Sequence, residues 1–205
     1  MAIFGSKDSK LNGSVSSATI ITNGSHIEGN LKGSDSVHVD GRVDGDIVVN
    51  NIVVIGKSGN VSGNIKAQKV ICSGIVDGFI ECEDIEIMQG SSVGYKIISK
   101  IVIVNSEFKG EIVCDKILID ELGVVSNKIQ AREVIVKGEF NGDVACETLT
   151  TKPTGRLKGN MFVNNILNEG GKVEGAIGQY KDLFAKEPEL LESSSDSVDV
   201  EVEDK

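Results

Sequence analysis

A five-residue phrase recurs along the chain: an apolar residue, any residue, usually Gly, any residue, and a second apolar residue. Residues 76–80, Val-Asp-Gly-Phe-Ile, are the clearest copy. Seven further copies lie at 27–31, 43–47, 61–65, 108–112, 140–144, 157–161 and 173–177, and two degraded copies lie at 93–97 and 125–129. Their first positions are 15 to 18 residues apart. Such a short period predicts a solenoid, because each unit can bury its apolar side only against its neighbours.

The composition favours strands and tight corners. Hydrophobic residues make up 40% of the 205 residues, but there is no Trp and there are only two Tyr and six Phe. The core must therefore be built from Ile, Val and Leu, and the β-branched ones among these favour strands. Twenty-four Gly with two Pro indicate sharp turns rather than a collagen-like or linker sequence. We predict an all-β fold, a single-stranded parallel β-helix of triangular section with about ten turns, over residues 18–178.

Side-chain alternation predicts which positions of each turn face inward. The phrase is expected to form one strand, and a second strand begins about five residues after its last position, so that positions five and seven after the phrase point inward. In the first turn this pattern is shifted by one, at Val37 and Val39. The second position after each phrase is small almost everywhere, which predicts one inward corner repeated along the stack; these residues are Gly33, Val49, Ala67, Cys82, Ser99, Cys114, Ala131, Cys146, Val163 and Gln179.

The cysteines fit a structural role. Cys82, Cys114 and Cys146 are 32 residues apart, which is two turns, or about 9–10 Å at roughly 4.8 Å per strand. A disulfide needs Cα atoms within about 7 Å. The chain has no Cys-x-x-Cys pair and only two His, so no zinc site is expected. We predict that all four cysteines, including Cys72, are reduced core residues in a reducing compartment.

No residue pattern predicts catalysis, cofactor binding or metal binding. Residues 56–58 resemble the end of a phosphate-binding loop, but Asn51 stands where that loop requires Gly, and a strand phrase follows instead of a helix. His26 and His38 lack an evident nucleophile or metal partner. The acidic residues of the phrases are expected to form surface ladders, although paired carboxylates for glycosidic chemistry are conceivable there; examples are Asp44, Asp46 and Asp77.

Charge separates the body from the C-terminal segment. The net charge is −10, of which residues 180–205 carry −6 and residues 1–179 carry −4. Binding of nucleic acid is therefore not expected. Residues 179–205 suggest a short helix followed by an acidic disordered tail. No apolar run is long enough to span a bilayer and no secretory signal is evident, so we expect a cytoplasmic protein.

The first 17 residues are predicted to be a flexible arm that carries a membrane-surface anchor. The arm starts with an apolar stretch followed by a lysine, which suits the interface of an anionic membrane; the anchor residues are Met1, Ala2, Ile3, Phe4 and Lys7. The alternative is an ordinary start of a tail. A single anchor would be weak, so membrane binding would require many chains acting together.

The ends of a β-helix predict self-association. A stack of parallel strands leaves unpaired N–H and C=O groups and an open apolar core at each end, and another chain can pair with these groups. We therefore expect end-to-end association of copies into filaments.

Residues 19–31 and 39–47 resemble the opening of the core of the bactofilins, a family of polymer-forming bacterial cytoskeletal proteins. The match continues through 61–67, 76–78 and 108–111. The resemblance implies a right-handed β-helix that polymerises without nucleotide or other cofactor into non-polar filaments. It also implies that these filaments lie on the inner face of the cell membrane and scaffold cell-wall or shape-determining proteins. The N-terminal stretch is similar to the membrane-targeting peptide of many members.

One departure concerns length. The bactofilin-like turns are expected at 18–114 and additional turns at 115–178, which either carry the polymer contact or cap the stack. Members have a Phe-x-Gly near the last turn that contributes to the polymer contact, and residues 108–110 and 140–142 both match it. The predicted contact residues are Ile20, Ile27, Leu31, Phe108, Phe140, Leu157, Met161, Phe162, Val173 and Ile177.

Two other readings compete. Left-handed β-helix enzymes of the hexapeptide acyltransferase or carbonic anhydrase type also have about 18 residues per turn, but they need a strict six-residue recurrence and a histidine in a mid-solenoid cleft. Here the spacing is irregular and both histidines precede residue 40. A secreted β-helix adhesin or polysaccharide lyase would need a signal sequence.

Overall fold

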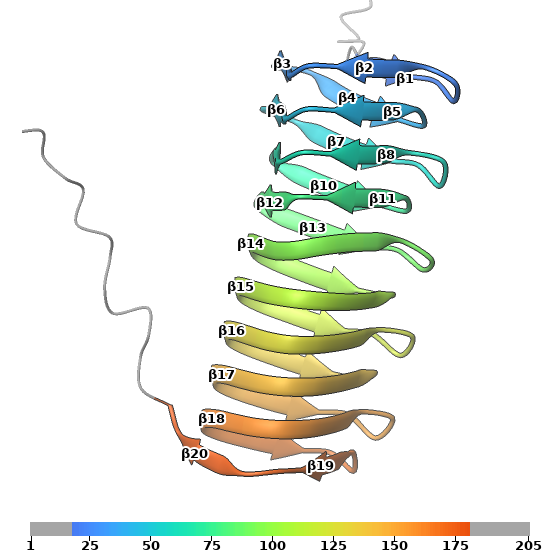
Figure 1. The fold of residues 1–205 in the computed structure, drawn as a ribbon. Helices are drawn as coiled ribbons and strands as arrows, with labels where there is room; N and C mark the ends of the chain where they lie inside the picture. Colours follow the sequence, from blue (N-terminus) through green and yellow to red (C-terminus); the bar gives the residue numbers. More distant parts are fainter. Residues whose placement is uncertain (1–17, 181–205) are drawn as a thin grey trace, which may run out of the picture.

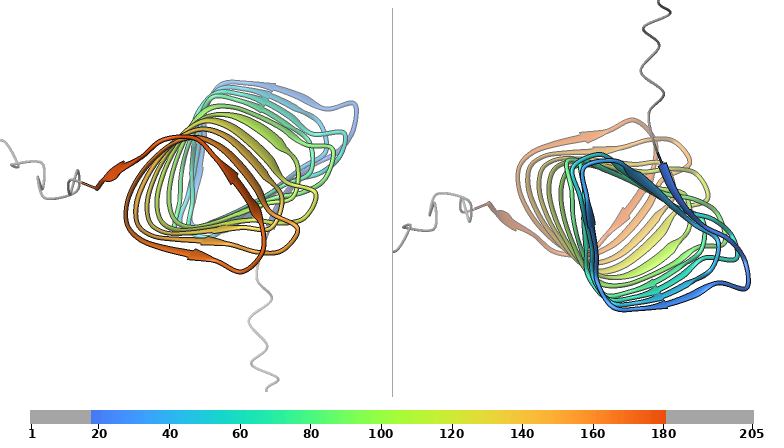
Figure 2. Two further views of the ribbon diagram at one scale, coloured as in Figure 1. Left: turned by 90° about the horizontal axis from the view of Figure 1, so that it is seen from below. Right: turned by 90° about the horizontal axis from the view of Figure 1, so that it is seen from above.

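The computed structural model describes residues 18–180. Within this range the chain forms twenty strands and no helix, and every strand pairing is parallel. The strands stack into a rod of about ten turns (Figure 1), and a view along the rod shows a three-sided outline (Figure 2). The predicted parallel β-helix is therefore confirmed. The predicted N-terminal arm and C-terminal tail lie outside the described residues.

The first four turns each contain three short strands. These are β1 (Ala18–Ile21), β2 (His26–Glu28), β3 (Leu31–Gly33), β4 (Ser36–Val39), β5 (Arg42–Asp44), β6 (Ile47–Val49), β7 (Ile52–Ile55), β8 (Asn60–Ser62), β9 (Ile65–Lys66), β10 (Lys69–Cys72), β11 (Ile75–Asp77) and β12 (Phe79–Glu81). Later strands bend around the corners without a break. They are β13 (Asp84–Ile87), β14 (Ser92–Val104), β15 (Glu107–Ile119), β16 (Val124–Val136), β17 (Glu139–Thr151), β18 (Arg156–Asn168), β19 (Lys172–Glu174) and β20 (Ile177–Gln179).

The strands form three faces. The first face consists of β1, β4, β7, β10, β13 and residues 101–104, 116–119, 133–136, 148–151 and 165–168. The second face runs from β2 through β5, β8 and β11 to the first residues of β14–β18 and then β19. The third face runs from β3 through β6, β9 and β12 to the middle residues of β14–β18 and then β20.

The repeated phrase spans the corner between the second and third faces. The expectation that it forms one strand is wrong for the first four turns, because β8 and β9 lie on either side of Gly63. Gly63 has a φ of 156°, and a Cβ there would overlap the carbonyl oxygen of Gly45 in the preceding turn. Only Gly fits this corner without strain. In the two degraded copies Tyr95 and Asn127 take this position with positive φ, so the backbone keeps its path at a conformational cost.

Loops of two lengths alternate between the first and second faces. Four-residue loops occur at 22–25, 56–59, 88–91, 120–123 and 152–155, and two-residue loops at 40–41, 73–74, 105–106 and 137–138. Each long loop closes as a β-turn, as shown by the bond from the Gly59 N–H to the Gly56 carbonyl. The structural repeat is therefore two turns, which explains both the uneven spacing of the phrase and the 32-residue spacing of the cysteines.

Inward side chains form continuous apolar columns along the rod. The buried residues are almost all Val, Ile and Leu, as predicted, together with Phe108 and Phe140. The small inward corner is also confirmed through its middle section, where Ala67, Cys114, Ala131 and Cys146 are buried. One prediction was wrong by a residue: in the second turn Val53 and Ile55 face inward instead of Ile52 and Val54. The shift seen at Val37 and Val39 therefore extends over two turns.

The four cysteines are free thiols at least two-thirds enclosed by the fold. Cys72, Cys114 and Cys146 are buried and Cys82 is half-buried. Burial raises the pKa of Cys72 and Cys82 to about 11 and that of Cys114 and Cys146 to about 12. Since the thiolate is the reactive form, these side chains serve packing rather than chemistry.

Candidate assembly interfaces

The N-terminal end presents three strands with a free edge. Within the described residues β1, β2 and β3 pair on one side only, with β4, β5 and β6. The inward-facing side chains of this turn form the end of the core; they are Thr19, Ile21, Ile27 and Leu31, opposite Val37, Val39, Val43 and Ile47. Ile27 and Leu31, both predicted contact residues, are partly exposed there.

Ile20, another predicted contact residue, has a different position. It lies opposite His38, whose side chain is on the outside of the rod, and it is 65% exposed. Ile20 therefore lies on the outer surface of the first face beside the end.

The C-terminal end presents three free edges as well. Residues 165–168 pair with β17, and β19 and β20 pair with β18, each on one side only within the described range. Ile166, Val173 and Ile177 lie opposite the buried residues Leu149, Leu157 and Met161. Because no described turn covers them, Ile166 is 39% and Ile177 is 63% exposed.

The sequence analysis missed Ile166. It lies five residues after the last position of the phrase at 157–161, where the alternation rule predicts an inward side chain. The rule was applied only to the interior turns, although the same signal would have identified this end residue.

The remaining predicted contact residues lie away from the ends. Phe108, Phe140, Leu157 and Met161 are almost completely buried within the stack. Phe162 is 45% exposed on the outer side of the third face, where it lines a hollow of about 430 Å³ together with Lys128, Asp143, Ala145, Gln179 and Tyr180. The role of these five residues in polymerisation stays a prediction, as does that of the other contact residues. The predicted anchor, Met1 to Phe4 with Lys7, lies outside the described residues.

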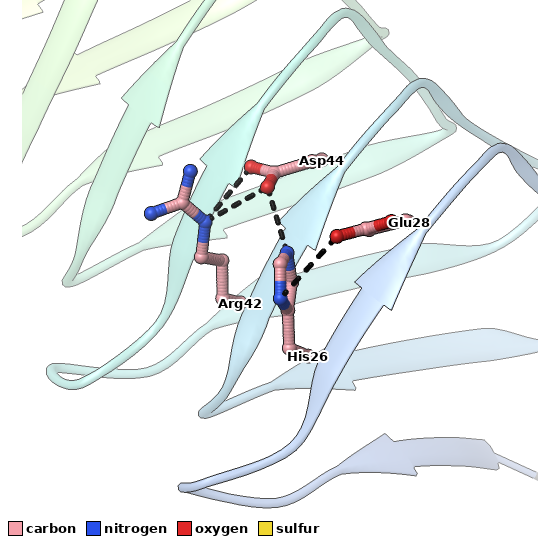
Figure 3. A network of polar contacts seen from close by, with 4 residues as sticks. All are labelled: His26, Glu28, Arg42 and Asp44. Carbon is pink, nitrogen blue, oxygen red and sulfur yellow. Dashed lines mark hydrogen bonds and ion pairs between the residues drawn. The ribbon is translucent and has the colours of Figure 1, made fainter.

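A polar network covers the second face at the N-terminal end (Figure 3). The His26 Nε2 atom lies 2.7 Å from Asp44 Oδ2, and the Arg42 Nε–H donates to both oxygens of the same carboxylate at 2.9 Å. Glu28 lies 4.0 Å from the His26 ring. The hydrogen bond from Arg42, followed by that with His26, holds the pKa of Asp44 below its ordinary value. These contacts join the first two turns by ion pairing and hydrogen bonding.

The other acidic candidates also serve the stack. The Asn30 side-chain oxygen accepts the backbone N–H of Asp46, and the Asp46 carboxylate accepts that of Asn64, both at 2.8 Å. The ladder continues from Asn64 to the N–H of Phe79 at 3.1 Å. Each side chain thus caps a backbone donor in the next turn. His38 lies 3.0 Å from Asp40, and residues 56–59 lead into strand β8 rather than a helix.

Two structural searches complete the description of residues 18–180. In that range no three His, Cys, Asp or Glu side chains gather closely enough to hold a metal ion. The same range contains no helix with the length and hydropathy that crossing a bilayer would require.

Comparison with known proteins identifies the family. A family model described as "Bactofilin: Polymer-forming cytoskeletal" matches residues 19–105 and again 94–178. The chain belongs to the bactofilin family. As a bactofilin it is a polymer-forming cytoskeletal protein, and its family is structural rather than enzymatic. The turns after residue 114, which the sequence analysis treated as additional, themselves match the family model.

A curated relative supports the assignment. This bactofilin is 32% identical over 80 residues to Bactofilin BacP of Myxococcus xanthus (strain DK1622). The aligned part covers 38% of this chain and 33% of the relative, so this bactofilin matches about a third of that protein's length. A search of the solved structures found no match.

Proposed function

We propose that this bactofilin assembles end to end into filaments without nucleotide, and that the filaments lie on the inner face of the cell membrane. There they act as a scaffold for cell-wall or shape-determining proteins. The observation that carries the proposal is the pair of ends, each with three strand edges that have no partner on one side within the described residues. Pairing one end with another copy satisfies these N–H and C=O groups.

The apolar side chains at the ends supply the driving force. Ile166 and Ile177 point along the core columns but have no described turn below them, so another copy would remove their exposed surface from water. Removing apolar surface from water contributes roughly 25 cal/mol per Å². Each joint thus reproduces the contact between two turns of one chain.

A variant that blocks only the C-terminal end tests the proposal and the filament polarity together. In Ile166→Lys/Ile177→Lys, two ammonium groups would lie in the joint, where burying an unpaired charge is costly. If like ends join, as non-polar filaments require, the variant forms dimers through its free N-terminal end. If unlike ends join, the variant stays at 21.7 kDa. Long filaments formed by the variant would contradict the end-to-end contact.

The control is Val113→Lys/Gln130→Lys, which adds the same charge at partly exposed outer positions of the third face. Negative-stain electron microscopy and sedimentation should show wild-type filaments in the control, with equal yield in nucleotide-free and ATP- or GTP-containing buffer. Circular dichroism should show the same β content in all three proteins. A requirement for nucleotide would overturn that part of the proposal.

The membrane part of the proposal rests on the sequence of residues 1–7. Deleting residues 1–4 should release filaments from vesicles of anionic lipid in a flotation assay, because Ile3 and Phe4 are the apolar anchor. The deletion should leave filament formation unchanged. Equal flotation of the deleted and complete proteins would refute the anchor.

A further inference from the structure

The outer side of the first face carries an unusually apolar ladder. One outward side chain of each turn stands opposite the next along the rod; this outer ladder consists of Ile20, His38, Val54, Ile71, Glu86, Ile103, Leu118, Ile135, Thr150 and Leu167. Seven of the ten are Ile, Leu or Val. Strands with one buried side usually carry polar residues on the other. The ladder thus leaves an apolar stripe on the surface of the rod.

The neighbouring outward column of this face carries charges that neutralise one another. Lys69 pairs with Glu86 of the ladder at 2.7 Å, and Lys116 pairs with Glu133 at 2.9 Å. Ile101 lies between these pairs and is largely exposed. Since each lysine already has a carboxylate partner, covering this face does not isolate either charge.

We propose that this face binds the same face of a second copy of the chain, with the two rods antiparallel. The ladder is straight and spans about 43 Å at roughly 4.8 Å per turn, so its partner must offer apolar groups with the same period. A second copy has that period. Sheets packed in this way lie about 10 Å apart with interdigitated side chains.

Charge complementarity selects the orientation. A two-fold axis along the strands sets ladder against ladder, whereas an axis along the rod would set the ladder against the charged column. With the axis between the turns of Leu118 and Ile135, these two residues of one copy face Ile135 and Leu118 of the other. The same operation sets Lys116 opposite Glu133, so both ion pairs have a second partner across the interface.

The area of this contact makes it weak between free copies and stronger between filaments. Six turns overlap in one pair, about 29 Å along the rod by 13 Å along the strands, or about 380 Å² per copy. Specific interfaces bury about 800 Å² per partner. In filaments formed as proposed above, all ten turns of each chain are covered, and the contacts repeat along both filaments. The filaments of this bactofilin should therefore pair side by side.

The test is an outer-ladder variant, Ile103→Lys/Ile135→Lys, compared with the third-face control Val113→Lys/Gln130→Lys. Wild type and control should form paired filaments that pellet at low speed. The ladder variant should form single filaments of normal length, with at least a five-fold smaller low-speed pellet. Ile103→Thr/Ile135→Thr, which keeps β-branched side chains, should have the same effect if the lysines impair folding. Paired filaments in both ladder variants, or single filaments in wild type, would overturn the proposal.

A second measurement separates this inference from the proposed function. If the wild type forms no filaments, end-to-end assembly fails, but the face contact can still be measured by sedimentation equilibrium at several hundred micromolar. A weak dimer is then expected, with a Kd that rises at least ten-fold in the ladder variants and stays unchanged in the control. No dimer, or a dimer insensitive to the ladder, would overturn the face contact.

Discussion

Replacing Thr151 by Val should stabilise the C-terminal turns. Thr151 is completely buried, and its Oγ1 atom has no hydrogen-bond partner among the described residues. It stands in an inward column between Val136 and Asn168. Burying a hydroxyl without a partner costs about 1–3 kcal/mol, and valine has nearly the same shape. The substitution should therefore raise the free energy of local unfolding by about 1–3 kcal/mol.

Hydrogen exchange is the suitable assay because a solenoid need not unfold as a single unit. At roughly 1.4 kcal/mol per factor of ten, the amides of β17 and β18 should exchange about 5- to 150-fold more slowly in Thr151→Val. Wild type and variant must be compared at one protein concentration, since self-association also protects amides.

The matched control is Thr148→Val in the same strand. Thr148 points outward and is partly exposed, so its hydroxyl reaches water and the change should be within about 0.5 kcal/mol. Unchanged protection in Thr151→Val, or an equal gain in Thr148→Val, would refute the argument that the unpaired hydroxyl destabilises the core.

Three further outcomes are expected. A thiol reagent at pH 8 should modify the native cysteines about 10²-fold more slowly than an exposed thiol, because their raised pKa values suppress the thiolate; rapid labelling of Cys146 in the native protein would contradict its burial. Gly63→Ala should destabilise by more than about 1 kcal/mol in chemical unfolding, whereas Gly33→Ala, which has open space and no positive φ, should be nearly neutral. Because the folded pKa of Asp44 is lowered from 3.8, its stabilising effect is present above that value and is lost as the pH falls through the lowered pKa. Exchange protection in β2 and β5 should fall in that range, and Asp44→Asn should remove this part of the pH dependence.

The sequence was sufficient to predict the architecture because the stacking constraint acts on every turn. The phrase recurs since its Gly must fit under the backbone of the preceding turn, as at Gly63 below Gly45. The alternating loop lengths were not predicted, because β-turns of four residues and links of two differ little in composition. The one-residue shift at Val53 was missed for a related reason: in a run such as 52–55, Ile-Val-Val-Ile, either pair of alternate residues can face the core.

The candidate interfaces were harder to predict because they depend on what is missing beside a residue. Phe108 matches a sequence pattern for a polymer contact, yet it lies inside the stack, where turns above and below cover it. Ile177 follows the same inward rule but lies in the last described turn and is exposed. A local motif does not distinguish these situations, since it reports the direction of a side chain and not the position of its turn in the rod.

The two ends also differ in polarity, which bears on how they join. At the N-terminal end the inward positions are mostly aliphatic, with Ile21, Ile27 and Leu31 beside a single threonine. At the C-terminal end one core column turns polar over its last two turns, from Thr151 to Asn168. A joint made there buries less apolar area for the same number of strand edges, so backbone hydrogen bonds must supply a larger share of its stability than in a joint between N-terminal ends. In a filament built from like ends the two kinds of joint would then differ in strength, and dimers joined through the N-terminal ends would be the more stable assembly unit.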